Sequence, residues 1–177
     1  MKKTVLTYGL ISGTIVSLWM VVSLAIGFEH LDSNWGMILG FTAMIIGFAF
    51  IFVAIKNYRE HFGDGRISFA KAFKIGLYIS LIASTVYVAV WMIDYYIFIP
   101  DFMEKYTAHY LENMKTAGAT QAEISEATSK MAWYREMYKN PLFVALLTYT
   151  EILPLGLVIS LIAAAILQRK QPPLAVE

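Results

Sequence analysis

Two carboxylates stand inside segments of the sequence that are otherwise apolar. Asp94 occurs in WMIDYYIFIP (91–100) and Glu151 in YTEILPLGL (149–157). An acid that faces lipid is costly, and a chain usually keeps one only where something compensates for its charge. By helical rise, Glu151 lies ~15 Å from the start of its apolar segment and Asp94 ~9 Å from the end of its own. The two acids are therefore predicted at similar depths, where they would meet if their helices are neighbours.

Several arrangements would make these acids tolerable. They would share one proton, because like charges in a low dielectric raise one pKa strongly, or they would hold a cation between them. Each would otherwise accept hydrogen bonds from neighbours such as Tyr87, Trp91 and Thr148, or line a polar ligand pocket under the segment that joins their helices. Counted instead from Lys74, about 20 residues of helix carry Asp94 ~30 Å, which puts it at the membrane surface with no special role.

Other chemistry finds little support in the sequence. The chain has no cysteine, which excludes disulfides, thiolate metal sites and cysteine nucleophiles. The histidines, His30, His61 and His109, lack the close spacing of a zinc site. Neither a nucleophile motif nor a phosphate-binding glycine loop occurs. We therefore expect no enzyme activity, no metal and no cofactor, and the net charge of +1 offers no field for nucleic acid.

The acids are carried by long apolar segments. Of the 177 residues, 58% are hydrophobic and only 15% are charged, which is too little polar material to cover a water-soluble globule. Segments long enough to cross a bilayer as helices, none containing Lys or Arg, are found at 5–28, 35–55, 75–99 and 142–167. The sequence predicts an all-α integral membrane four-helix bundle, one membrane domain over 1–177, with the lipid bilayer as its partner.

Basic residues predict how the chain crosses the membrane. They cluster before the first span, between the second and third, and after the fourth: Lys2, Lys3, Lys56, Arg59, Arg66, Lys71, Lys74, Arg169 and Lys170. Loops rich in Lys and Arg stay on the cytoplasmic side. Both termini are therefore predicted in the cytoplasm, with the protein in the cytoplasmic (inner) membrane.

Small residues at helical spacing predict how the spans associate. Helices in lipid cannot associate by escaping water, so they approach closely through small side chains. Such residues occur in every span: Gly9 and Gly13 in the first, Gly36, Gly40 and Gly47 in the second, Gly76 with Ser80 in the third, and Gly156 with Ser160 in the fourth. These seams either pack one bundle internally or, most plausibly on span two, join two copies as a homo-oligomer.

The segment between the third and fourth spans, 101–140, is predicted to form an extracytoplasmic helical hairpin. Asp101 with Glu104, and Thr120 with Glu123, have the spacing of capping boxes, in which each side chain satisfies free amides at a helix start. Aromatic and aliphatic residues recur on one face of each helix. The hairpin would fold over the mouth of the bundle or lie on the membrane surface.

Six stretches together resemble a known family: MKKTVLTYGLISG, FVAIKNYRE, DGRISFAKAFKIGL, IPDFMEKY, MYKNPLF and YTEILPLGL. They are similar to domain of unknown function 4199, a family of uncharacterised bacterial membrane proteins, over essentially the whole chain. The resemblance implies a compact four-span inner-membrane protein. It supplies no activity, substrate or catalytic residue.

The sequence favours a non-enzymatic role. The first expectation is a structural or interaction bundle that self-associates or serves a membrane-protein partner. The alternative is a small proton- or cation-linked transporter that uses Asp94 and Glu151. Four spans are few for a transporter, and the sequence shows no internal inverted repeat.

Overall fold

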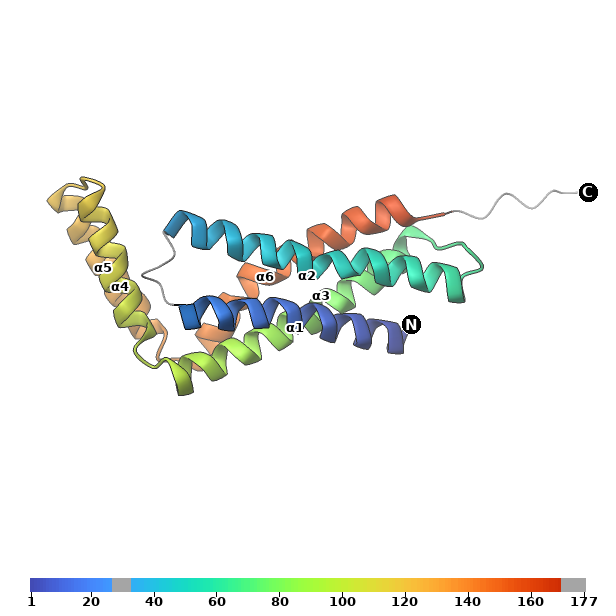
Figure 1. Cartoon of the computed structure of the whole chain (residues 1–177), viewed down its shortest axis with the longest axis horizontal. Helices are drawn as coiled ribbons and strands as arrows, with labels where there is room; N and C mark the ends of the chain where they lie inside the picture. The colour runs from blue at the N-terminus through green and yellow to red at the C-terminus, as the bar shows by residue number, and fades with distance from the viewer. Residues whose placement is uncertain (27–32, 170–177) are drawn as a thin grey trace, which may run out of the picture.

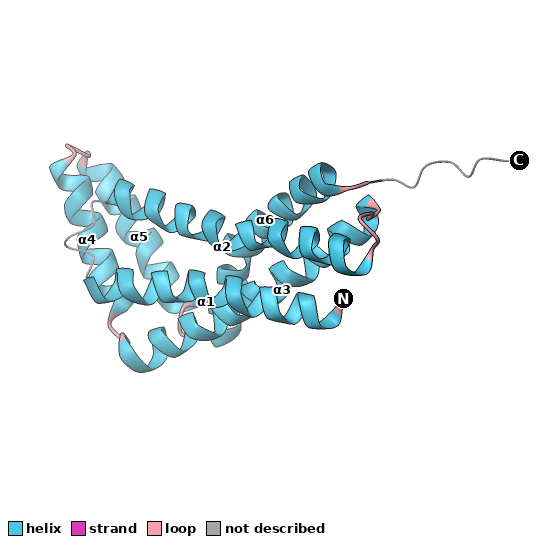
Figure 2. Cartoon of the chain, turned by 45° about the vertical axis from the view of Figure 1, so that its right-hand side comes forward, coloured by secondary structure: helices cyan, strands magenta, loops and turns pink. Residues whose placement is uncertain are grey.

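The computed structural model describes residues 1–26 and 33–169, with the backbone alone for 33–37. Its helices are α1 (Lys2–Ile26), α2 (Ser33–Phe62), α3 (Phe69–Ile93), the short π-helix η2 (Asp94–Phe98), α4 (Phe102–Thr116), α5 (Gln121–Met137) and α6 (Pro141–Leu167). Apart from a single-residue bridge, the described residues form no β-structure. The predicted all-α class is therefore confirmed (Figure 2). Residues 27 and 28 of the predicted first span lie outside the described residues.

The helices extend beyond the predicted apolar segments. Span two was predicted to end at residue 55, and α2 continues to Phe62; span three was predicted to start at residue 75, and α3 begins at Phe69. The hydrophobic pattern marks only the part of a helix that lipid surrounds, whereas backbone hydrogen bonding continues into the polar region. The extra turns carry the basic residues of the α2–α3 connection.

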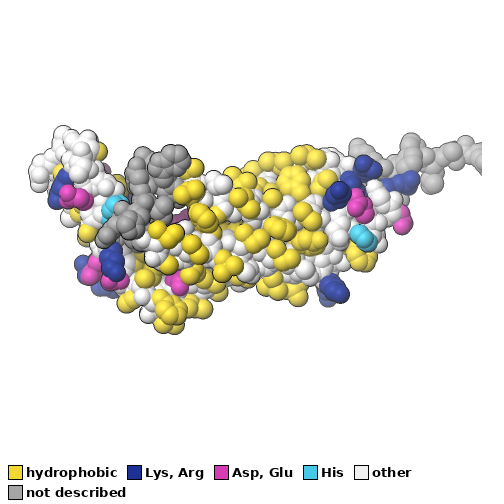
Figure 3. All heavy atoms as spheres, in the orientation of Figure 1, with side chains coloured by type: hydrophobic (Ala, Val, Ile, Leu, Met, Phe, Trp, Pro, Cys, Tyr) yellow, Lys and Arg dark blue, Asp and Glu magenta, His cyan; other side chains and the backbone are white. Residues whose placement is uncertain are grey.

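The four long helices form one bundle (Figure 1). α3 packs against α1 and α6, and α2 packs against α1, α3 and α6. We call the end covered by α4 and α5 the hairpin end, and the end with the α2–α3 connection the turn end. Hydrophobic side chains cover the middle of the bundle, whereas most of the visible charged ones lie toward its two ends (Figure 3). This distribution matches a protein whose middle is immersed in lipid.

The most extensive helix contact joins α3 and α6, which run antiparallel. A Cβ added to Gly76 would lie 2.7 Å from Ser160 Oγ, and one added to Gly156 would lie 2.7 Å from Ser80 Oγ. Each glycine therefore receives the serine of the facing helix. The serine hydroxyls lie 3.1 Å apart, and each donates to the carbonyl four residues earlier in its own helix. Small side chains with satisfied hydroxyls thus let the two backbones approach.

The glycines of α1 and α2 have different surroundings. Added Cβ atoms would lie 2.8 Å from Ile82 Cβ at Gly9, 2.8 Å from Val86 Cβ at Gly13, and 2.4 Å from Val16 Cγ2 at Gly47. These three residues lie at helix contacts within the bundle.

Gly40 differs from them, because an added Cβ would meet nothing within 4 Å. The environment of Gly36 lies outside the described side chains. Association of two copies through α2 stays a prediction.

At the turn end, side-chain and backbone hydrogen bonds join the α2–α3 connection to the end of α6. Arg59, which is buried, donates from Nη1 to the carbonyl of Leu167 at 3.2 Å. Ile67 and Arg169 exchange two backbone hydrogen bonds of 3.3 and 2.9 Å. Ser68 accepts from the amide of Lys71 and caps α3.

At the hairpin end, α4 and α5 lie across the bundle rather than along it (Figure 1). The capping box predicted at Thr120 is confirmed, because Thr120 and Glu123 exchange the expected hydrogen bonds. The one predicted at Asp101 is wrong. Its backbone (φ −90°, ψ 7°) is not extended, and its side chain forms an ion pair with Lys105 at 2.7 Å instead. Of the two placements predicted for the hairpin, the structure has the one that covers the bundle.

Candidate ligand cavity

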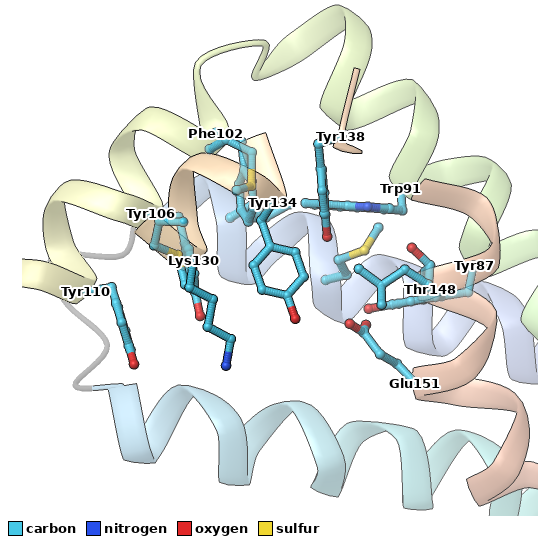
Figure 4. Close-up of a pocket in the computed structure, with 15 residues that line it drawn as sticks. Tyr87, Trp91, Phe102, Tyr106, Tyr110, Lys130, Tyr134, Tyr138, Thr148 and Glu151 are labelled. Atoms are coloured by element: carbon cyan, nitrogen blue, oxygen red, sulfur yellow. The ribbon is translucent and has the colours of Figure 1, made fainter. Parts of the chain in front are cut away.

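A cavity of about 560 Å³ lies between the bundle and the hairpin. Fifteen residues line it (Figure 4): Met20, Leu24, Tyr87, Trp91, Phe102, Met103, Tyr106, Tyr110, Lys130, Met131, Tyr134, Tyr138, Leu147, Thr148 and Glu151. They come from α1, α3, α4, α5 and α6, and the described side chains of α2 contribute none. Its size and its mostly aromatic and aliphatic walls with a few polar groups are typical of ligand sites.

Stacked and edge-on rings attach the hairpin above this cavity. Trp91 of α3 meets Phe102 of α4 edge to face at 4.9 Å between ring centroids, and Tyr95 meets Tyr138 at 5.4 Å. The hydroxyl of Tyr96 donates to the carbonyl of Tyr138 at 3.1 Å. Aromatic pairs of this geometry favour association beyond the area that they bury. These contacts hold α4 and α5, which form the roof of the cavity, against α3 and η2.

The π-helix η2 determines where Asp94 lies. The amide of Ile99 donates to the carbonyl of Asp94 at 2.8 Å, which closes a wider turn than an α-helix has. Asp94 is partly buried, and its Oδ2 has no hydrogen-bond partner among the described residues. Asp94 is not among the residues that line the cavity. π-helical turns often occur at functional sites. In this structure, however, Asp94 does not lie in the cavity with Glu151.

Glu151 does line the cavity, beside two of the neighbours named from the sequence. Its carboxylate lies next to the hydroxyl of Tyr87, with Thr148 close by (Figure 4). Thr148 is buried and donates its hydroxyl proton to the carbonyl of Val144 at 2.8 Å. Its oxygen therefore faces the cavity as an acceptor. Oxygen acceptors gather at this side of the cavity.

Sequence reasoning missed Lys130 of α5, the one basic residue among the described residues that line the cavity. Its Nζ lies toward the same end of the cavity as the hydroxyl of Tyr110, and the hydroxyl of Tyr134 lies between it and the Glu151 carboxylate (Figure 4). Among the described residues, neither Lys130 nor Glu151 forms an ion pair. One signal was present in the sequence: Lys130 precedes Tyr134 by four residues and therefore shares its helix face.

Two tyrosines of this end, Tyr106 and Tyr138, keep their protons. Burial, and to a smaller degree the charge of Glu151, raise the pKa of Tyr138 above its usual value. Burial raises the pKa of Tyr106 as well. At neutral pH both hydroxyls are therefore protonated. Within the described part of the chain, no group of three or more His, Cys, Asp or Glu residues would hold a metal ion.

The fold and the cavity define the class of protein. Within the described residues, four helices are long and apolar enough to cross a membrane, at Lys2–Ile26, Ile38–Phe62, Phe69–Phe98 and Pro141–Leu167, so this is a multi-pass helical membrane protein. The family model described as "Protein of unknown function (DUF4199)" matches residues 7–169, and the chain belongs to that family. The resemblance seen in the sequence is thereby confirmed. Comparisons with curated proteins and with solved structures found no match.

Proposed function

We propose that the protein is a non-enzymatic membrane protein that binds a ligand in the cavity beneath its hairpin. One observation carries this proposal: a cavity of about 560 Å³ contains Lys130 and Glu151 between aromatic walls, and neither forms an ion pair with any described residue. Both side chains are exposed, so their charged groups are accessible to a ligand with complementary groups. A purely structural bundle has no need of such a space.

The proposed location is the cytoplasmic membrane, with both termini in the cytoplasm. The N-terminus, the α2–α3 connection and the end of α6 all lie at the turn end (Figure 1). That end carries the basic clusters that predict a cytoplasmic position. The hairpin and its cavity would then face the opposite side.

The transporter that the sequence offered as an alternative receives less support. It requires Asp94 and Glu151 to act together, and only Glu151 lines the cavity. Binding is therefore the role that we propose.

Two adjacent leucines provide the test. Leu147 lines the cavity, whereas Leu146 is 57% exposed on the outer surface of α6. Leu147→Trp would fill the cavity with an indole, and Leu146→Trp is the matched control. Native mass spectrometry of the detergent-purified chain should detect a non-covalently bound molecule in the wild type and in Leu146→Trp. Leu147→Trp should retain none, and equal retention by both variants would refute the proposal.

A further inference from the structure

We propose that the ligand is a zwitterion with a primary ammonium group and a phosphate, the chemistry of a phosphoethanolamine headgroup. This inference rests on the proposed binding function and specifies its ligand. Two sources carry this chemistry: an aminophospholipid of the membrane, or a water-soluble headgroup such as glycerophosphoethanolamine. The cavity has an acceptor side and a donor side, and each suits one end of such a molecule.

The acceptor side suits a primary ammonium. Glu151 has a carboxylate with no hydrogen bond among the described residues, and the proton of Thr148 is already donated to Val144. The hydroxyl of Tyr87 lies beside Glu151 (Figure 4). Three oxygens therefore face one region, and a primary ammonium has three N–H donors to offer them. A quaternary ammonium has none, so its choline analogue would leave these acceptors unsatisfied.

The aromatic walls of the cavity also favour a positively charged group on the ligand. Trp91 and Tyr87 border the side of the cavity where Glu151 lies, and Tyr134 stands between Glu151 and Lys130 (Figure 4). The face of an aromatic ring attracts a cation within about 6 Å, most strongly at tryptophan. The walls and the carboxylate therefore act in the same direction.

The donor side suits a phosphate. Lys130 contributes an ammonium with three donors, the hydroxyl of Tyr110 opens toward the same end, and the hydroxyl of Tyr134 lies between Lys130 and Glu151. Lysine binds phosphate as a point charge, and charge-assisted hydrogen bonds are about twice as strong as neutral ones. A phosphate diester would accept from all three groups.

The separation of Lys130 from Glu151 and the volume of the cavity restrict the class of ligand further. Lys130 and Glu151 are more than 4.0 Å apart, since they form no ion pair. A ligand that satisfies both needs opposite charges on separated atoms, and an ethanolamine link provides such a spacing. About 560 Å³ holds a headgroup and glycerol but not two acyl chains. For a lipid, the chains would leave along the apolar wall formed by Met20, Leu24 and Leu147.

A lipid competition with the full-length chain tests the inference. Detergent-purified, delipidated protein is incubated with equal amounts of phosphatidylethanolamine, phosphatidylcholine and phosphatidylglycerol, repurified, and its bound lipid is quantified. We expect phosphatidylethanolamine to be enriched about tenfold over the other two, the order that one charge-assisted hydrogen bond supplies. Glu151→Gln should remove that preference. Lys130→Gln should weaken the binding of all three, because all contain phosphate.

The controls are charge-removing variants of the hairpin outside the cavity, Glu126→Gln and Lys115→Gln, which should behave as wild type. If Glu151→Gln does not fold, Thr148→Val removes one acceptor at nearly constant volume and should lower the enrichment about threefold. Displacement of bound lipid by millimolar glycerophosphoethanolamine would support the class with the soluble headgroup as its source. Lipid enrichment without displacement would support the membrane source.

Equal binding of the three lipids, together with no binding of glycerophosphoethanolamine, would overturn the inference. That outcome is separate from failure of the binding function. If a molecule is still retained by Leu146→Trp and lost from Leu147→Trp, the cavity binds a ligand of another class. If neither difference is seen, both proposals fail.

Discussion

The two halves of the bundle use the same helices, α3 and α6, in opposite ways. Toward the turn end, the helices meet through glycine and serine, and Phe48, Ile51 and Ile79 are fully buried around them. Toward the hairpin end, large rings project between the helices and surround a cavity. In one half the hydroxyls of Ser80 and Ser160 each have a partner in their own helix, and in the other Glu151 and Lys130 have none among the described residues. The comparison indicates that one half provides stability and the other provides a site.

The largest effect should come from separating α3 and α6 at their closest contact. In Gly156→Val the added carbons would meet Ser80, which is fully buried, and Phe48 Cζ at 2.9 Å. We expect a loss of about 3 kcal/mol in the free energy of unfolding, as overpacking of a tight core produces. Unfolding in mixed micelles measures it. Gly40→Val, where the added atoms meet open space, should change stability by less than about 0.5 kcal/mol. Equal losses in both variants would contradict the assignment of the packed half.

A smaller, local effect should follow from removing ring contacts that hold the hairpin against α3 and η2. Tyr95→Leu removes ring contacts with Tyr138 at 5.4 Å and with Phe102 at 6.2 Å. Docking of the hairpin should lose about 2 kcal/mol, because each aromatic pair contributes ~0.5–1.5 kcal/mol. Amide hydrogen exchange should accelerate in α4 and α5 and stay slow in the rest of the bundle. The same substitution at the turn end of α3, Tyr78→Leu, should leave exchange in the hairpin unchanged. Faster amide exchange throughout the chain would mean that the turn end and the hairpin end do not open independently.

The smallest effect concerns the hydroxyl pair of the packed half. Ser80 and Ser160 are 3.1 Å apart, yet each has one proton, and each lies within reach of a carbonyl in its own helix. A double-mutant cycle with Ser80→Ala and Ser160→Ala should therefore give a coupling of about 0.6 kcal/mol or less, as is usual for hydrogen bonds between membrane helices. A coupling above about 1.5 kcal/mol would show that hydrogen bonding, rather than close approach, holds these helices together.

The packed half could be predicted from the sequence to a large extent. Apolar segments of about 20 residues have few structures open to them other than a membrane helix. Small residues four apart, as in Gly76 with Ser80 and Gly156 with Ser160, share a helix face whatever the rest of the chain does. Local patterns decide these features, and the four long helices and the cap at Thr120 followed from them.

The site could be predicted only in part. Residue counting predicts depths for Asp94 and Glu151 but not their directions around the helix axes, and η2 adds a wider turn that no periodicity indicated. The position of Lys130 depends on how the hairpin crosses the bundle, which is set by contacts between rings distant in sequence, such as Trp91 with Phe102. Tyr87 and Thr148 line the cavity with Glu151 because Thr148 is on the same helix and Tyr87 is on α3, which packs against that helix.

The reciprocal fit of glycine and serine also limits how α3 and α6 can move. Sliding one helix along the other by a turn, about 5.4 Å, would place Ser80 directly opposite Ser160 in place of Gly156, so two side chains would meet where a serine now meets a glycine. Translation is therefore blocked, and rotation about this contact is the motion that remains. A rotation about this contact moves the ends of the two helices more than the residues at the contact. An opening that admits a ligand would therefore leave α3 and α6 in contact at their glycines and serines. The two helices would separate most at the hairpin end, where the aromatic residues line the cavity.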